Sequence, residues 1–348
     1  MKLMKKLSLA ATMILTITLA ACAATGNDTT GPGELANFFP FHPNTLATFT
    51  VEGVGEPGLR TIYNTYISGN RVQRMIHATA FAPSLEIIEV SGSQVRLVFG
   101  DPFYYNLEDM TDVAQSLDIV LLQTPLQVGT SWNNGDETST ITAIDAQIET
   151  PFGAFTAIEV TTISADGSEE KFYYAEGFGL VKSIHPSPIG TFVVSLAELA
   201  TDRPAEIPLD ILFPNIDENV IDVETRILHA TTNTDLVPLL TRELSVPPAS
   251  YALPLLPEGT AINSIEVSRA INVAHVDVSS SLRNWDDLGD GVIGAVFVSL
   301  TNTLGLFYEV EYVLWTMDGA SFEWGPIVLN DGDAERVINL EELTGGQN

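Results

Sequence analysis

Short runs in which apolar and polar residues alternate dominate the chain from residue 35 to about residue 199. TIYNTYI and RVQRMIHATA flank the turn residues 68–70 (SGN), and LEIIEV and QVRLVF flank residues 91–93 (SGS). Such alternation predicts half-buried strands, and Ser, Gly and Asn between two runs are typical of hairpin turns. We therefore expect two β-hairpins in this part of the chain.

Three further runs continue the pattern: STITAIDAQIE, FTAIEVTTI and EKFYYAEGFGLVKSI. Helical periodicity is weak here, and one short helix is expected around residues 109–117. Strands at regular spacing with turns between them predict an antiparallel sheet that is curved or closed on itself. We expect a mainly β domain, a curved sheet or half-barrel, over residues 35–200. Candidates for its core are Trp132, Phe152, Phe155 and Tyr174.

The segment TDRPAEIPLDILFPNIDE, residues 201–218, contains three prolines and several acids. Proline lacks the backbone N–H that helices and central strands need, so this density predicts neither element. We expect a linker between two domains over residues 201–222.

The last third of the chain has a different pattern. ETRILHAT and LVPLLTREL predict two strands, and AINSIEVS and NVAHVDVS predict another pair. Apolar residues then recur with helical spacing over residues 291–306, which predicts an amphipathic helix with Asp290 as its N-cap. FYEVEYVLWTM predicts a closing strand. Together these elements predict a small α+β sandwich with the helix on one face of the sheet.

Four phrases in this region resemble the GerMN domain, the sporulation and spore-germination module of Gram-positive bacteria. They are PEGT at residues 257–260, the A-x-V-D-x-S pattern at residues 274–279, TNTL at residues 301–304, and Asp318-Gly319 after the last strand. The resemblance implies a GerMN-like domain over residues 223–345 that makes protein–protein contacts or self-associates, in sporulation or germination. Family members usually carry a helix between the second and third strands. Because PPASYALPLL contains two prolines there, we expect that helix to be shortened or lost.

The N-terminus is organised like an export signal. Three lysines within the first six residues precede an apolar run from Leu7 to Leu19. The site Leu19-Ala20-Ala21-Cys22 resembles the bacterial lipobox, which implies cleavage before Cys22 and attachment of diacylglycerol to its thiol. There are two alternatives. The segment could be an ordinary secretory signal that leaves Cys22 as a free thiol, or residues 7–27 could be an uncleaved membrane span.

This organisation predicts the location of the protein. We expect residues 1–21 to be a lipoprotein signal peptide and residues 22–34, which are small, polar and contain Gly and Pro, to be a flexible tether. The protein would then be anchored in the cell membrane by lipid and face the extracytoplasmic side. Cys22 is the single cysteine of the chain, so its acylation leaves no disulfide, cysteine-based metal site or thiol nucleophile.

Charge narrows the possible partners. The 45 acidic residues outnumber the 15 basic residues and give a net charge of −30. Because binding to nucleic acid needs clustered Lys and Arg, we expect no nucleic-acid partner. A solvated acidic surface that keeps the protein soluble is the simplest interpretation of the excess.

Residues that could carry catalytic or metal chemistry are few. No two of the five histidines are three or four residues apart, and no nucleophile-elbow, Walker or dinucleotide-binding motif occurs. We therefore expect a non-enzymatic protein without a cofactor. The carboxylates of Asp286, Asp287 and Asp290 are a weak candidate for a calcium site. They lack the EF-hand spacing, and the favourable charge of acids at a helix N-terminus also explains their presence.

Two functions remain. The leading hypothesis is an envelope lipoprotein that makes contacts with envelope proteins, or with copies of itself, through its C-terminal domain. The alternative is an envelope lipoprotein whose β-rich domain binds an apolar ligand or lipid, because a wide curved sheet can leave its interior open. Aromatic residues could line the mouth of such a site, and the candidates are Phe81, Phe99, Phe103, Tyr104 and Tyr105. An ordinary core would use the same residues equally well.

Overall fold

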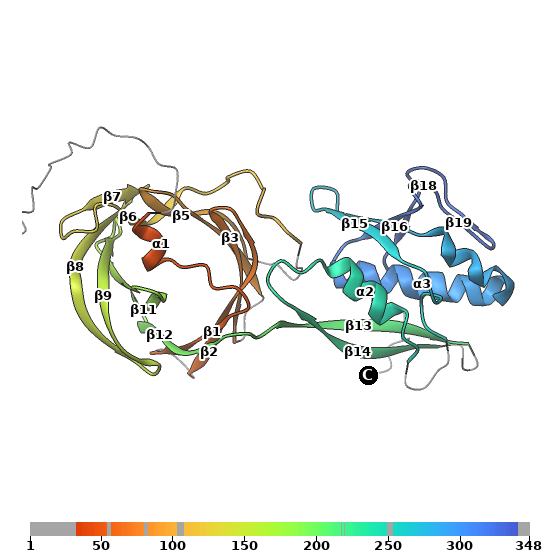
Figure 1. Cartoon of the computed structure of the whole chain (residues 1–348), viewed down its shortest axis with the longest axis horizontal. Coiled ribbons are helices and arrows are strands. Elements are labelled where there is room, and N and C mark those ends of the chain that lie inside the picture. Colours follow the sequence, from red (N-terminus) through yellow and green to blue (C-terminus); the bar gives the residue numbers. More distant parts are fainter. Residues whose placement is uncertain are drawn as a thin grey trace, which may run out of the picture.

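The computed structural model describes residues 33–53, 57–79, 83–102, 108–216, 218, 220–248 and 253–339. The lipobox of Leu19, Ala20, Ala21 and Cys22 lies outside these residues, so the lipid anchor stays a prediction. The described chain forms a curved sheet followed by a smaller α+β part (Figure 1).

Twelve antiparallel strands form the first part. Their order in the sheet is β6-β5-β4-β3-β2-β1-β12-β11-β10-β9-β8-β7, so two meanders are joined where β1 pairs with β12. Both predicted hairpins form, and the expected sheet curved on itself is confirmed (Figure 1). The strands are β1 (Leu46–Glu52), β2 (Gly58–Ser68), β3 (Arg71–Ala78), β4 (Ser84–Val90), β5 (Gln94–Asp101), β6 (Ile119–Gln123), β7 (Ser131–Asn134), β8 (Glu137–Thr150), β9 (Gly153–Ile163), β10 (Glu169–Ala175), β11 (Gly179–Ser187) and β12 (Gly190–Ala200).

Side chains, rather than a strand ladder, connect the two ends of this sheet. The Val120 N–H on β6 donates to Asn134 Oδ1 at 2.9 Å, and Asn134 Nδ2 donates to the Val120 carbonyl at 3.0 Å. Trp132 Nε1 donates to the same carbonyl at 2.9 Å. Exposed strand edges leave backbone groups that would pair with other chains. The amide of Asn134 takes the place of a neighbouring strand at Val120, and the sheet is nearly closed.

An irregular segment, rather than the helix expected at residues 109–117, covers part of the convex face. Gln73 Nε2 donates to the Glu108 carbonyl at 2.7 Å, and the Met110 N–H donates to Gln73 Oε1 at 2.7 Å. Arg71 Nη1 donates to the carbonyls of Thr111 and Val113 at 3.0 and 3.1 Å. Side chains of β3 thus satisfy backbone groups of this segment that a helix would have paired internally.

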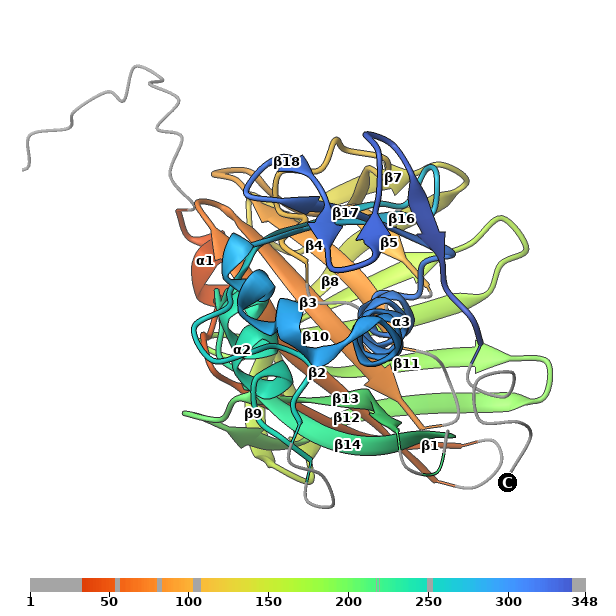
Figure 2. The ribbon, with the colours of Figure 1, turned by 90° about the vertical axis from the view of Figure 1, so that its right-hand side faces the viewer.

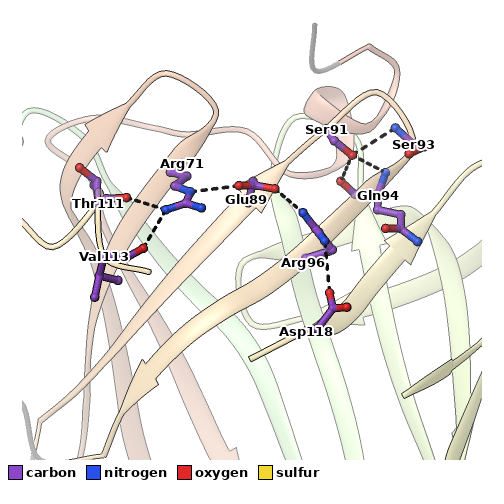
Figure 3. A network of polar contacts seen from close by, with 9 residues as sticks. All are labelled: Arg71, Glu89, Ser91, Ser93, Gln94, Arg96, Thr111, Val113 and Asp118. Atoms are coloured by element: carbon purple, nitrogen blue, oxygen red, sulfur yellow. Dashed lines mark hydrogen bonds and ion pairs between the residues drawn. The ribbon is translucent and has the colours of Figure 1, made fainter. Parts of the chain in front are cut away.

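The same face carries a row of alternating charges across three strands (Figure 3). Arg71, Glu89 and Arg96 are cross-strand neighbours on β3, β4 and β5, and both arginines bind the Glu89 carboxylate. Arg96 Nη1 also contacts Asp118 Oδ1 at 3.2 Å. Burial alone would raise the pKa of Glu89, but hydrogen bonds and positive charge from the two arginines outweigh it and lower the pKa.

The second part contains two helices, a 3₁₀ segment and two main sheets. β13 and β14 form a two-stranded ribbon, while β15, β16, β17 and β18 form a sheet in which β16 and β17 are parallel and β21 pairs with β17. Short strands β19 and β20 pair with each other. The elements are β13 (Ala205–Asn215), β14 (Val220–Ala230), α2 (Leu236–Leu244), β15 (Ile262–Ser268), β16 (Val273–Val278), η1 (Ser280–Leu288), α3 (Asp290–Phe307), β17 (Tyr312–Met317), β18 (Ala320–Ser321), β19 (Glu323–Trp324), β20 (Ile327–Val328) and β21 (Ala334–Arg336).

The segment expected to be a linker, residues 201–222, instead contains β13. Its eleven residues pair with β14 from Ala205 to Asn215, and Pro208 and Pro214 lie within the ladder. A strand with a partner on one side tolerates proline where the missing N–H would point away from that partner. The two prolines are six residues apart and therefore point their backbone nitrogens to the same edge. Proline density alone was a poor guide here.

LVPLLTREL forms helix α2 rather than the predicted strand. Asp235 caps its N-terminus by accepting a hydrogen bond from the Val237 N–H at 3.0 Å. Leu236, Leu240 and Leu244 recur every four residues on one buried face. A helix of nine residues therefore does lie between β14 and the next strand, β15, so the helix is not lost, and it precedes PPASYALPLL.

Helix α3 forms where the helical periodicity predicted it, but it lies between two sheets instead of covering one (Figure 2). Thr301 Oγ1 accepts a hydrogen bond from Trp315 Nε1 of β17 at 3.1 Å. Two residues along, Thr303 Oγ1 accepts one from the Leu212 N–H of β13 at 3.0 Å. The TNTL phrase that resembles GerMN therefore supplies buried polar contacts to both layers.

Direct contacts join the two parts. The Tyr63 hydroxyl of β2 lies 3.0 Å from the Arg203 carbonyl and 3.3 Å from the Ala230 carbonyl, and burial raises the pKa of Tyr63. Asn44 and Thr232 exchange two hydrogen bonds of 2.8 and 2.9 Å. The outer face of β2 is therefore docked on the second part.

Replacing Asn134 by alanine tests the closure of the sheet. The variant removes both amide contacts to Val120, and we expect it to lower the free energy of unfolding by about 1–2 kcal/mol. Urea denaturation measures this loss, and hydrogen exchange at the Val120 amide should accelerate. The matched control is Asn133→Ala, since the Asn133 side chain contacts the exposed Thr138 hydroxyl. An equal loss in both variants would contradict closure through Asn134.

Candidate ligand cavity

A cavity of about 280 Å³ lies within the curve of the twelve-stranded sheet. Its lining includes Ala47 and Phe49 of β1 and Arg60, Ile62 and Asn64 of β2, which are alternate residues and therefore share one face of the sheet. Strands β3 to β6 and β10 to β12 supply further lining residues from the same concave side. The volume lies near the lower end of the roughly 300–1,000 Å³ typical of small-molecule sites.

Most of the lining is apolar. The loop after α1 (Leu35–Phe38) contributes Phe39 and Phe41, and strands β10 and β11 contribute Phe172 and Leu180. Leu35 itself is fully buried and packs in the core beside the cavity. The first described residues therefore fold into the curve of the sheet and narrow it.

Exposed aromatic rings mark one edge of the cavity. Phe178 lines the cavity and is still 38% exposed, so the cavity reaches the surface there. Its ring packs edge-on against Phe155 and Phe152, with centroid distances of 5.0 and 5.7 Å. Phe152, at the turn between β8 and β9, is 42% exposed, so the prediction that it belongs to the core is wrong. Trp132 and Tyr174 are buried as predicted.

Two arginines share one carboxylate inside the cavity. Arg74 and Glu86 are cross-strand neighbours on β3 and β4, and their side chains form an ion pair. Arg60 Nη2 lies 4.0 Å from the other oxygen of Glu86. The Arg74 guanidinium also lies over the ring of Phe39, 5.2 Å from its centroid. All four residues line the cavity, and the three charged ones sum to one positive charge.

The hydrogen bonding of these arginines is incomplete. Arg60 Nε and Arg74 Nε are buried and have no hydrogen-bond partner among the described residues. Burial lowers the pKa of Arg60, the charge of Glu86 opposes that shift, and Arg74 adds to it. Burial also raises the pKa of Tyr174, which lies near Arg74 and Glu86. Buried donors without acceptors are uncommon in folded proteins and are a signal for a ligand or an ordered water.

Two other polar groups of the lining are paired. His42 Nε2 donates to the Gly177 carbonyl at 2.8 Å, and Asn64 Nδ2 donates to the His42 carbonyl at 2.9 Å. These bonds fasten the loop after α1 to both walls of the sheet. The arginine cluster, by contrast, keeps donors that no acceptor among the described residues meets.

Ser183, His185 and Glu170 form a series that resembles a nucleophile, base and acid. Ser183 Oγ lies 2.7 Å from His185 Nε2, and His185 Nδ1 lies 3.0 Å from Glu170 Oε1. Acyl transfer also needs donors directed at a developing oxyanion. Ser183 sits inside β11, where its backbone is paired with β10 and β12. An exposed nucleophile with free backbone donors, as on a strand-to-helix turn, is therefore not formed here.

The structure brings together residues that sequence reasoning did not select. Phe99 packs against Leu85 and Ile87 in a separate cluster and is not among the cavity-lining residues, so its predicted place at the mouth is wrong. The other predicted mouth residues, Phe81, Phe103, Tyr104 and Tyr105, lie outside the described residues. Arg60, Arg74 and Glu86 were missed. The sequence did contain a signal for this cluster. In R-V-Q-R-M-I, residues 71–76, Arg74 alternates with the apolar Val72 and Ile76 and therefore shares their face of the strand.

The weak calcium candidate gains no support. Asp286 and Asp287 lie in η1, while Asp290 begins α3, whose N-cap is Gly289 rather than Asp290. In the part of the chain that the structure describes, no group of three or more His, Cys, Asp or Glu side chains is arranged to hold a metal ion. Within the same residues, α3 is long and apolar enough to span a membrane, but 56% of it is buried, as in a core helix.

Several solved structures resemble this chain weakly. A Bacteroides fragilis protein with a YmcC-like fold is 10% identical, with 47% of this chain and 98% of that chain covered, at a TM-score of 0.32. A Parabacteroides distasonis protein described as a lipoprotein is 15% identical. The match covers 50% of this chain and 100% of that chain, at a TM-score of 0.30. A chain of the Pseudomonas aeruginosa MucA/MucB complex is 11% identical. The match covers 65% of this chain and 66% of that chain, at a TM-score of 0.24. TM-scores this low assign no function to this chain, and no curated protein matches it.

A family model does match the second part. Residues 211–323 match the Germane family, described as sporulation and spore germination. The matched range begins within β13 and ends in β19, so it takes in part of β13, all of β14, helices α2 and α3, and strands β15 to β18. It starts earlier than the GerMN resemblance in the sequence suggested. Residues 211–323 are thus similar to the Germane family, and this range is called the Germane domain below.

Proposed function

We propose that this protein is a lipid-anchored, extracytoplasmic and non-enzymatic envelope protein that holds an apolar ligand in its twelve-stranded sheet. The observation that carries the proposal is the cavity of about 280 Å³, which is lined mainly by apolar side chains and reaches the surface at Phe178. Ligand sites are concave and mostly apolar, with a few polar groups placed to orient the ligand. The Germane domain supports sporulation or germination as the setting.

The expected anchor would bring this cavity close to the membrane. The stretch from Cys22 to Gly33 spans at most about 40 Å when fully extended. The chain then enters α1 and the loop that carries Phe39 and Phe41 into the cavity. A ligand taken from the membrane surface would therefore need to travel a short distance. This geometry favours a membrane-derived apolar ligand.

Filling the cavity tests ligand binding. Ala47→Phe adds a ring from the inner face of β1, and we expect at least a tenfold loss of affinity for an uncharged fluorescent probe such as N-phenyl-1-naphthylamine, because the added ring takes the ligand's space. Fluorescence titration of a soluble form that lacks residues 1–22 measures this. Thr48→Phe is the matched control, since the adjacent residue points to the other face. Absence of probe binding by the unsubstituted protein would overturn the proposed function.

A second function, protein contact through the Germane domain, is favoured by one surface. Val223 and Ile227 lie on the same face of β14 and are 40% and 44% exposed. Of the described strands, β13 is the one that pairs with β14, so the other edge of the ribbon is open to a partner. Apolar side chains beside an open strand edge are suited to association with a second chain.

Charged substitutions test this surface. Val223→Glu together with Ile227→Glu should abolish any concentration-dependent association of the soluble form, because two buried carboxylates would oppose an apolar contact. Sedimentation velocity over a hundredfold range of concentration measures the association. The control is Val298→Glu, which makes the same change at a site on α3 that is also 40% exposed. A strict monomer at every concentration would remove self-association and leave envelope proteins as the partners to test.

The lipid anchor has a direct test. Cys22→Ser removes the thiol that diacylglycerol would modify, and we expect incorporation of labelled fatty acid to be lost. The protein should then either leave the membrane fraction or persist as an uncleaved precursor. Metabolic labelling and fractionation in a bacterium that processes lipoproteins measure both effects. Labelling that is unchanged in the variant would refute the anchor.

A further inference from the structure

The arginine cluster of the cavity, Arg60, Arg74 and Glu86, carries a positive charge in a strongly acidic protein. The chain has a net charge of −30, yet the charged side chains that line the cavity are two arginines and one glutamate. The side chains of Arg60 and Arg74 are partly buried, with 31% and 16% of their surface exposed. Arg60 and Arg74 compete for the same carboxylate, and among the described residues the buried Nε atom of each has no hydrogen-bond partner.

The row on the convex face shows how this chain completes such a cluster when no ligand is involved. There Arg71 and Arg96 also share one carboxylate, that of Glu89 (Figure 3). Arg71 in addition donates to two backbone carbonyls, and Arg96 pairs with Asp118. The two arginines of this row are therefore balanced by two carboxylates, and Nη1 of Arg71 binds backbone carbonyls. Within the described part of the chain, the cluster in the cavity has neither a second anion nor the additional acceptors.

We propose that the cavity binds an anionic amphiphile, whose acidic head group is held by Arg60 and Arg74 while its hydrocarbon chain occupies the apolar lining. This inference rests on the proposed function and specifies the class of its ligand. The shared chemistry of the head group is a carboxylate or a phosphate, both of which match the planar fork of arginine donors. Free fatty acids and phospholipid-derived species are the two sources of that chemistry.

The surroundings of the cluster favour an amphiphile over a small hydrophilic anion. Phe39 packs under the Arg74 guanidinium, and Ile62 and Ile88 lie on the same inner face as the charged residues. A free inorganic phosphate would occupy a small part of the cavity and would leave the apolar lining in contact with water. An ionised head on a hydrocarbon chain satisfies the donors and fills the apolar volume together.

The test compares probes that share one tail. Palmitate, hexadecyl phosphate and the uncharged 1-hexadecanol are each titrated against the soluble form that lacks residues 1–22, by displacement of a bound fluorescent probe. We expect at least one charged probe to bind about tenfold or more tightly than the alcohol, which corresponds to about 1.4 kcal/mol. Tighter binding of palmitate indicates a fatty-acid ligand, and tighter binding of hexadecyl phosphate indicates a phospholipid-derived one; both results support the proposal.

Arg60→Met is the decisive variant, because it leaves the Arg74–Glu86 ion pair in place and keeps a long apolar side chain. We expect the preference for the charged probe over the alcohol to fall at least fivefold, while affinity for the alcohol stays within about twofold. Arg96→Met makes the same change on the convex face and should leave the preference unaltered. The preference is a ratio measured on one sample, so partial unfolding of a variant does not distort it.

The outcomes separate this inference from the proposed function. Equal binding of the three probes by the unsubstituted protein overturns the anionic ligand but leaves the apolar site standing. An unchanged preference in Arg60→Met also overturns it. Failure of every probe to bind overturns both the inference and the proposed function.

Discussion

The fold depends on how a sheet of twelve strands closes. Eight strands give a barrel whose interior side chains can fill, and wider barrels leave space inside. Here the two ends of the sheet meet at Val120, where the amide of Asn134 pairs with both backbone groups of one residue. The loop after α1 enters the wide interior and narrows it, but a volume of about 280 Å³ stays open. The cavity is therefore a consequence of strand number and closure, and the residues on its wall decide what it can hold.

The sheet treats charge differently on its two faces. On the convex face, Arg71 finds acceptors in the Glu89 carboxylate and in the backbone of the covering segment, and Arg96 pairs with the carboxylates of Glu89 and Asp118. On the concave face, no segment of comparable polarity covers the arginines in the described structure, and their Nε atoms stay unsatisfied. An unsatisfied buried donor costs about 1–3 kcal/mol. A protein that keeps two of them in one cavity retains a destabilising feature that binding of an anion would relieve.

Sequence patterns predicted α3 and several of the longer strands, among them β2 to β5, β8 and β9, because apolar residues recur regularly along them. They failed at α2, whose nine residues include a proline, and at β13, whose prolines occupy one edge of a ribbon. The cavity was less predictable for a different reason. The alternation of residues along β2 shows that Arg60 and Ile62 share a face. Which face is concave depends on the pairing of β1 with β12, which are far apart in the sequence. Aromatic runs such as FYY were more conspicuous in the sequence, and Phe99 packs outside the cavity.

Strand β2 connects the two parts through its alternating side chains. Arg60, Ile62 and Asn64 face the cavity, while Tyr63 between them contacts the carbonyls of Arg203 and Ala230. Asn64 serves both sides, because its side chain binds the His42 carbonyl and its own carbonyl accepts a hydrogen bond from Thr232 of the Germane domain. A displacement of β2 that accommodates a ligand would therefore displace these contacts as well. Occupancy of the cavity and the position of the Germane domain would then be coupled through β2.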